Sequence, residues 1–109
     1  MVPDQAHFYD TLGLAMRAGL VTLGEDGVLK AIASGNAAFV LVDAGASANT
    51  RKKFADACAF RGVPLFETEP DRLGQAIGKS GRMSAALQPG KLADRLLAAA
   101  RENDIFIQK

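Results

Sequence analysis

The sequence predicts an α/β fold, a three-layer α/β/α sandwich with a four-stranded mixed sheet. Four short apolar segments alternate with five segments of helical periodicity along the 109 residues. Such alternation predicts a sheet between layers of helices. The segment at 38–44, AFVLVDA, is apolar almost throughout, as expected of a central strand covered on both faces. Because helical crossovers join strands in parallel, neighbouring strands are expected to be largely parallel.

Apolar spacing and capping residues indicate the helices. Phe8 and Leu12 lie one helical turn apart in the first of them. Gly35 is a natural stop for the second helix. Asn49 or Thr50 can cap the start of the third. The five helices are expected at 5–18, 25–34, 50–61, 71–77 and 91–102.

The strands are short segments rich in branched and apolar residues, bounded by turn residues. Besides 38–44, strands are expected at 20–23, 63–67 and 83–88. The tail at 105–107, IFI, is also apolar. It fits either an extra strand of the sheet or a contact with a partner, and the sequence leaves both open.

Size and composition predict one compact domain over residues 1–109, with 49% hydrophobic and 23% charged residues. No apolar run approaches the ~20 residues of a membrane span, and the first residues do not resemble a secretion signal. Cys58 is the single cysteine, so no internal disulfide is possible. A reducing, cytoplasmic setting and no membrane association are therefore expected.

The charge balance requires any nucleic-acid site to be local. Thirteen Lys and Arg against twelve Asp and Glu give a net charge of +1. The first candidate is the stretch from Gly24 to Gly35, where a helix begins directly after a strand. Its free N–H groups and positive dipole end suit a phosphate. Further candidates are the basic residues Arg51, Lys52, Lys79 and Arg82, whose alternative interpretation is an ordinary solvated surface.

No catalytic constellation is apparent. The loop GQAIGKS at 74–80 has three residues between its glycines where a phosphate-binding Walker loop has four, and it follows a helix instead of a strand. His7 and Cys58 lie on different helices at packing positions, and no spacing of metal ligands occurs. We therefore expect neither an enzyme nor a bound metal or cofactor.

Three segments carry a resemblance to a known family. They are LGLAMRAGLVTLGEDGVLKAI, AFVLVDAGASANTRKKFADACAFRGVPL and LGQAIGK. Together they resemble the L-seven-Ae/L-thirty-e family of ribosomal-type RNA-binding proteins, and within it the bacterial YlxQ-like branch, over about residues 8 to 100. The resemblance implies a three-layer sandwich that binds structured RNA such as a kink-turn. It places the RNA face at Gly24 to Lys30, Gly45 to Arg51 and Gly78 to Ser84.

The match to the family pattern is uneven. Gly24 and Lys30 match its glycine and its phosphate-binding lysine, and Met83 offers an apolar contact. Kink-turn binders usually carry Asn-Glu where this chain has Asp26 and Gly27, so base recognition is altered. The predicted RNA-binding residues are Gly24, Glu25, Asp26, Lys30, Arg51, Lys52, Lys79, Arg82 and Met83.

The preferred hypothesis is a small non-catalytic protein that binds structured RNA, either ribosomal RNA or a kink-turn. One alternative is a protein-interaction module on the same fold, with the ribosome or another protein as partner. Another is the substrate-binding domain of an RNA-modifying enzyme. A positive surface around Gly24, Lys30 and Arg82 favours RNA. An acidic surface made by Glu25, Asp26 and Asp43 argues against it.

Overall fold

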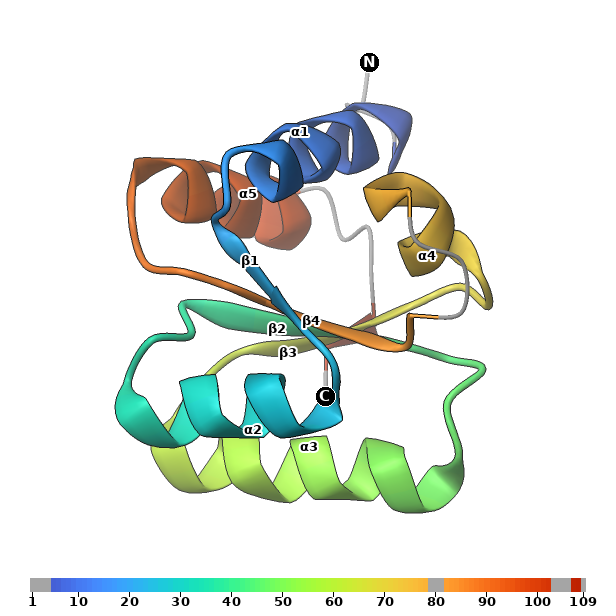
Figure 1. Ribbon diagram of the computed structural model, residues 1–109, viewed down its shortest axis with the longest axis vertical. Helices are drawn as coiled ribbons and strands as arrows, with labels where there is room; N and C mark the ends of the chain where they lie inside the picture. Colours follow the sequence, from blue (N-terminus) through green and yellow to red (C-terminus); the bar gives the residue numbers. More distant parts are fainter. Residues whose placement is uncertain (1–4, 79–81, 103–106, 109) are drawn as a thin grey trace.

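The computed structural model describes residues 5–78, 82–102 and 107–108 (Figure 1). Helices and strands alternate along the chain as expected. The helices are α1 (Gln5–Arg17), α2 (Glu25–Ser34), α3 (Ala48–Arg61), α4 (Arg72–Ile77) and α5 (Lys91–Glu102). The strands are β1 (Val21–Leu23), β2 (Phe39–Asp43), β3 (Leu65–Thr68), β4 (Ser84–Leu87) and β5 (Ile107–Gln108).

The sheet lies between two layers of helices. Its strand order is β1-β4-β2-β3-β5. Helices α1, α4 and α5 cover one face, and α2 and α3 cover the other (Figure 1). This arrangement confirms the predicted three-layer sandwich and its mixed sheet. The two-residue strand β5 pairs antiparallel with β3 and adds an edge to the four expected strands, so Ile107 of the apolar tail belongs to the sheet.

The expectation that neighbouring strands are largely parallel was wrong. Only β2 and β3 pair in parallel among the described strands, while β4 runs antiparallel between β1 and β2. The crossovers through α2 and α3 do keep β1, β2 and β3 in one direction. Helix α4 has six residues and spans only ~9 Å, and the chain re-enters the sheet from the end at which β3 leaves it.

Two hydrophobic clusters fill the space on either side of the sheet. Strand β2 is buried along its whole length, as predicted for the central strand. Its residues alternate, so that Phe39 and Leu41 face the cluster under α1, α4 and α5, while Val40 and Val42 face the cluster under α2 and α3. Both layers of helices are therefore fixed on one rigid strand. Within the described residues, no helix is both long and apolar enough to span a membrane.

The start of α3 differs by two residues from the prediction. The cap is Ser47, whose hydroxyl accepts a hydrogen bond from the Thr50 N–H at 3.1 Å. Asn49 and Thr50 lie within the first turn instead. Because a serine three residues before the bonded amide satisfies an otherwise unpaired donor, the helix begins earlier than the apolar spacing indicates.

Candidate nucleic-acid interface

Three segments that are far apart in the sequence meet at one end of the sheet. The ends of β1 and β2 and the beginning of β4 lie together there, at the right-hand end of the sheet in Figure 1. They surround a hollow of about 260 Å³, which we call the α2-start hollow. Its lining consists of Gly24, Glu25, Ala46, Ser47, Thr50, Arg82, Met83 and Ser84.

The strand-to-helix junction at Gly24 leaves the start of α2 open. Gly24 has φ 88° and ψ 149°, a conformation that residues with a side chain rarely adopt. Its carbonyl accepts from the Val28 N–H at 2.9 Å, which is the first bond of the helix. In the part of the chain that the structure describes, no side-chain hydrogen bond caps this end of the helix. The first turn of α2 therefore presents backbone donors at the positive end of a ten-residue helix.

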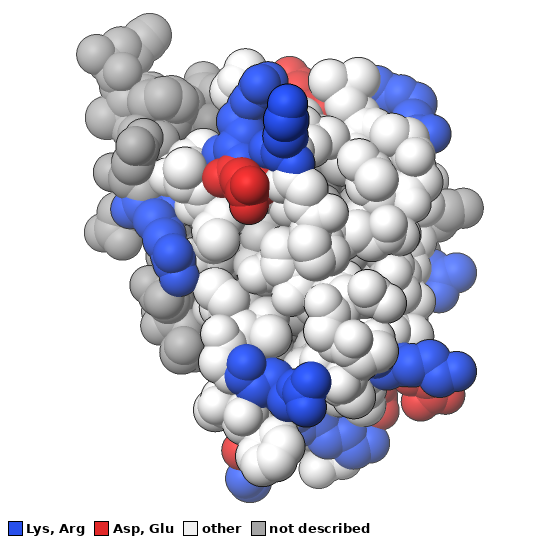
Figure 2. All heavy atoms as spheres, turned by 90° about the vertical axis from the view of Figure 1, so that its left-hand side faces the viewer, with Lys and Arg blue, Asp and Glu red and all other residues white. Residues whose placement is uncertain are grey.

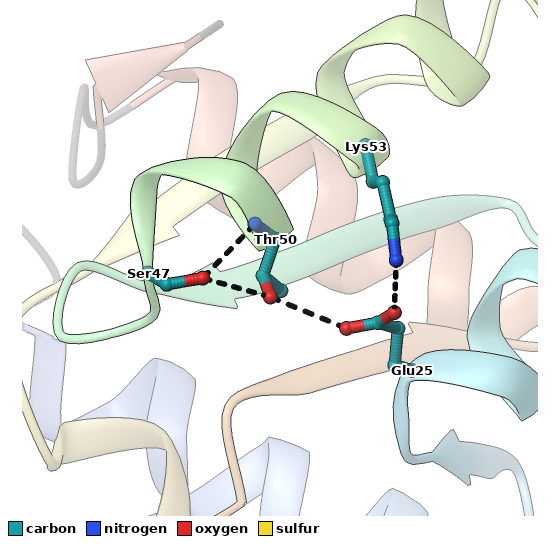
Figure 3. Close-up of polar contacts among 4 residues, drawn as sticks. All are labelled: Glu25, Ser47, Thr50 and Lys53. Carbon is teal, nitrogen blue, oxygen red and sulfur yellow. Dashed lines mark hydrogen bonds and ion pairs between the residues drawn. The ribbon is translucent and has the colours of Figure 1, made fainter.

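Glu25 joins the starts of α2 and α3 (Figure 3). One carboxylate oxygen accepts from the Thr50 hydroxyl at 3.2 Å, and the other pairs with the Lys53 ammonium at 2.9 Å. The hydrogen bond from Lys53 lowers the pKa of Glu25, and the same contact raises the pKa of Lys53. Glu25 therefore lines the hollow with its carboxylate already occupied by two partners from α3.

Ser47 and Thr50 line the α2-start hollow and lie in the predicted segment Gly45 to Arg51, although neither was named among the predicted RNA-binding residues. Ser47 donates to the Thr50 hydroxyl at 3.0 Å, and Thr50 in turn donates to Glu25. Both side chains are therefore held in fixed positions (Figure 3). A serine followed three residues later by the first helical amides is a capping signal, which would have marked Ser47 in the sequence.

The loop before β4 contributes Arg82 and Met83 to the same hollow. Arg82 is exposed, and no hydrogen bond or ion pair holds it within the part of the chain that the structure describes. Met83 is partly buried and packs against the cluster under α2 and α3. Lys79, the other basic residue predicted for this loop, lies outside the described residues.

Arg51 and Lys52 are not brought into the α2-start hollow. Arg51 donates to the Ala46 carbonyl at 3.1 Å and pairs with Glu67 at 3.4 Å. Lys52 pairs with Asp56 at 2.9 Å. Both line a different hollow of about 310 Å³ beside β3. The basic run at the start of α3 is thus largely neutralised by partners within the protein.

Lys30 lies on the flank of α2 and not at its start. It is exposed, and it lines a third hollow of about 360 Å³ between α2 and β1. Asp26 is exposed on the first turn of the same helix. Gly24 and Lys30, which the family resemblance places on one RNA face, therefore belong to two hollows that share α2.

Fewer acidic side chains are exposed near the start of α2 than the sequence suggests. Asp43 is fully buried at the end of β2, where one carboxylate oxygen accepts from the Gly45 N–H at 2.7 Å. It therefore shapes the loop after β2. With Glu25 paired to Lys53, Asp26 remains as the exposed acid of the first turn of α2.

The charged residues on the side of the molecule that lies on the left in Figure 1 are scattered. Figure 2 shows this side, with Lys and Arg in separate groups around its edges and mostly uncharged residues between them. No continuous basic surface covers this view.

Among the described residues, no group of three His, Cys, Asp or Glu side chains is placed to hold a metal ion.

Comparison with known proteins identifies the family of this chain. Residues 6–94 match the model of the ribosomal protein L7Ae/L30e/S12e/Gadd45 family. The chain belongs to this family. One curated relative is the RNA-binding protein YlxQ of Bacillus subtilis (strain 168). It is 39% identical to this chain over 92 residues, which cover 84% of this chain and 92% of the relative. The RNA-binding protein YlxQ of Enterococcus faecium is 36% identical over 80 residues, covering 72% and 78%.

Solved structures of similar proteins share the fold. A Bacillus halodurans protein of unknown function superposes with a TM-score of 0.82 at 31% identity, covering 89% of this chain and 99% of that one. A Giardia lamblia protein, the 15.5kD RNA binding protein, superposes with a TM-score of 0.75 at 19% identity, covering 88% and 83%. At 19% identity, the similarity to the Giardia lamblia protein shows the fold alone.

Proposed function

We propose that this protein is a non-catalytic, cytoplasmic RNA-binding protein that holds structured RNA at the α2-start hollow. The observation that carries the proposal is the convergence of the open start of α2, the Ser47–Thr50 hydroxyls and Arg82 around one hollow. Backbone donors at a helix start and a nearby guanidinium suit the phosphates of RNA. The names of the Bacillus subtilis and Enterococcus faecium relatives support the same function.

In this proposal, phosphate contacts provide most of the affinity. Gly27 has no side chain with which to recognise a base, and Asp26 brings a negative charge that a phosphate disfavours. Losing one bidentate base contact reduces discrimination by roughly 1–3 kcal/mol, judged by the comparable contacts in DNA recognition. We therefore expect a kink-turn to be preferred only weakly over other structured RNAs.

The experiment is a titration of the protein with three RNAs: a kink-turn, a plain duplex and an unstructured strand. Binding should weaken steeply as salt is raised, because released counterions drive phosphate binding. Absence of salt-sensitive binding to all three RNAs at micromolar protein would overturn the proposal. Binding of the kink-turn RNA and of neither other RNA would overturn the expectation of a weak preference.

A second candidate is protein interaction through the opposite layer of helices. A hollow of about 540 Å³ lies between α1 and α4, lined in part by Arg17 and Arg72. Leu14 stands at its rim with 54% of its surface exposed. A protein complex that survives high salt and is lost in Leu14→Ser would favour this candidate. The third hypothesis, a domain of a modifying enzyme, finds no support in the Bacillus subtilis relative, of which the match leaves less than a tenth uncovered.

A further inference from the structure

The hollow beside Lys30, which we call the α2-flank hollow, has a lining suited to an RNA backbone. It measures about 360 Å³, and the residues that line it include one cation and no carboxylate. Besides Lys30 the polar groups are two hydroxyls and two amides. Lysine, serine, threonine, asparagine and glutamine are the usual side-chain contacts to phosphate and sugar oxygens. The full lining is Thr22, Gly27, Lys30, Ala31, Ser34, Asn36 and Gln88.

The two amide residues are held at the rim by the fold. The Gln88 N–H donates to the Leu20 carbonyl at 2.9 Å, and its side-chain amide donates to the Gly19 carbonyl at 3.3 Å. The Asn36 N–H donates to the Ala31 carbonyl at 2.9 Å, directly after the left-handed Gly35 that ends α2. Such fixed backbone positions lower the entropy cost of ordering the groups when a ligand binds.

Gly27 allows α2 to lie close to β1 at the α2-flank hollow. A Cβ atom at this position would lie 3.2 Å from the Thr22 methyl carbon, closer than an ordinary van der Waals contact. Helix α2 therefore lies close to β1 because residue 27 has no side chain. The same feature that removes a base-recognising side chain leaves open surface between the start of α2 and Lys30.

The α2-start hollow and the α2-flank hollow follow one another along α2. Gly24, Gly27 and Lys30 are three residues apart, which is ~4.5 Å of helix per step. An RNA that uses both the start of α2 and Lys30 must pass over Gly27. We infer that the α2-flank hollow binds a second stretch of the sugar–phosphate backbone of the same RNA. Lys30 contacts its phosphate, and Asn36 and Gln88 contact its oxygens. This inference rests on the proposed function.

The test places a carboxylate of nearly the same size in the α2-flank hollow, and thermal unfolding of the variant reports the effect of losing the hydrogen bond from the Gln88 side chain to the Gly19 carbonyl. Gln88→Glu is compared with Gln75→Glu, which makes the same change of net charge on exposed Gln75 of α4, in the opposite layer. Dissociation constants are measured for the wild-type protein and both variants with the RNA that binds most tightly. Gln88→Glu should weaken binding about fivefold or more through like-charge contact. Gln75→Glu should change it by less than about twofold because salt screens distant charges.

A second variant blocks the hollow without adding charge. Gly27→Gln introduces a side chain between the two hollows and a better helix former than glycine, and thermal unfolding reports whether the fold is kept. Weaker binding by a folded Gly27→Gln supports the inference. Equal binding by Gln88→Glu and Gln75→Glu, together with unchanged binding by Gly27→Gln, would overturn it while the proposed function stands. Failure of the wild-type protein to bind any RNA overturns the proposed function itself.

Discussion

At the scale of single residues, Gly24 shows how backbone conformation and function coincide. Apart from the two neighbours in the chain, no atom of the described residues lies within 4 Å of the position that a Cβ at residue 24 would occupy, so space does not require glycine there. The requirement is conformational, since φ 88° with ψ 149° is adopted almost only by glycine. The turn leads β1 directly into α2 and leaves the first helical amides facing outward.

Gly24→Ala should therefore destabilise the protein by about 1–3 kcal/mol, the typical cost of a strained backbone position. The free energy of unfolding in urea measures this. Gly35→Ala is a useful comparison, because Gly35 has φ 80° and ψ 13° at the end of α2 and alanine tolerates that left-handed region at about 1–2 kcal/mol. A Gly24→Ala protein as stable as the wild type would contradict the argument.

Lys30→Ala should weaken binding of all three test RNAs by a similar factor, because a phosphate contact carries no sequence information. The slope of log affinity against log salt should become shallower by roughly 0.7 to 0.9 when one phosphate contact is lost. Arg61→Ala removes one positive charge from the C-terminal end of α3 and serves as the control. An unchanged slope in Lys30→Ala would mean that Lys30 makes no phosphate contact.

At the scale of elements, the Glu25–Lys53 pair acts as a brace between α2 and α3. Both oxygens of Glu25 are occupied from α3, by Thr50 and Lys53. The sequence prediction that Glu25 contacts RNA remains untested, but the geometry favours a positioning role for this residue. The brace fixes the Ser47–Thr50 segment beside the start of α2, and through it the shape of the α2-start hollow.

Lys53→Met should raise the pKa of Glu25 toward its ordinary value, since the contact that lowers it is removed. A carboxyl group with a lowered pKa in the folded state stabilises the protein above its unfolded pKa and loses that effect as pH falls through the folded pKa. The variant should therefore lose less stability than the wild type between about pH 5 and pH 3, around the ordinary pKa of a glutamate.

Measurement of the Glu25 carboxyl shift by NMR titration tests this directly. Lys52→Met is the matched control, because Lys52 pairs with Asp56 and not with Glu25. Equal Glu25 pKa values in the wild-type protein and in Lys53→Met would show that the pair does not persist in solution.

At the scale of the whole molecule, the two hydrophobic clusters hold the helices on the sheet. Phe54 and Phe60 both belong to α3, but Phe54 has 0% of its surface exposed and Phe60 has 86%. Phe54→Ala should lower the free energy of unfolding by about 3–5 kcal/mol through lost burial and a cavity. Phe60→Ala should change it by about 0.5 kcal/mol or less. Chemical denaturation compares the two, and equal losses would contradict the observed packing.

Most elements were predictable because their signals are local. The apolar run of β2 and the helical spacing in α1 need no knowledge of distant residues. The position of β4 between β1 and β2 was not predictable in this way, since pairing depends on how the chain returns after α4. Ser47 was missed as the cap of α3, although its spacing to Thr50 carries a local signal.

The sequence by itself determined the class of fold, the family, and the positions of Gly24 before α2 and Lys30 within it. These depend on residue types at fixed spacings along the chain. Only the tertiary structure decided which charges remain free. Glu25 is occupied by Lys53, Asp43 is buried, and Lys30 lies in a hollow of its own. The physical reason is that ion pairing and burial depend on distances between elements, which no local spacing contains.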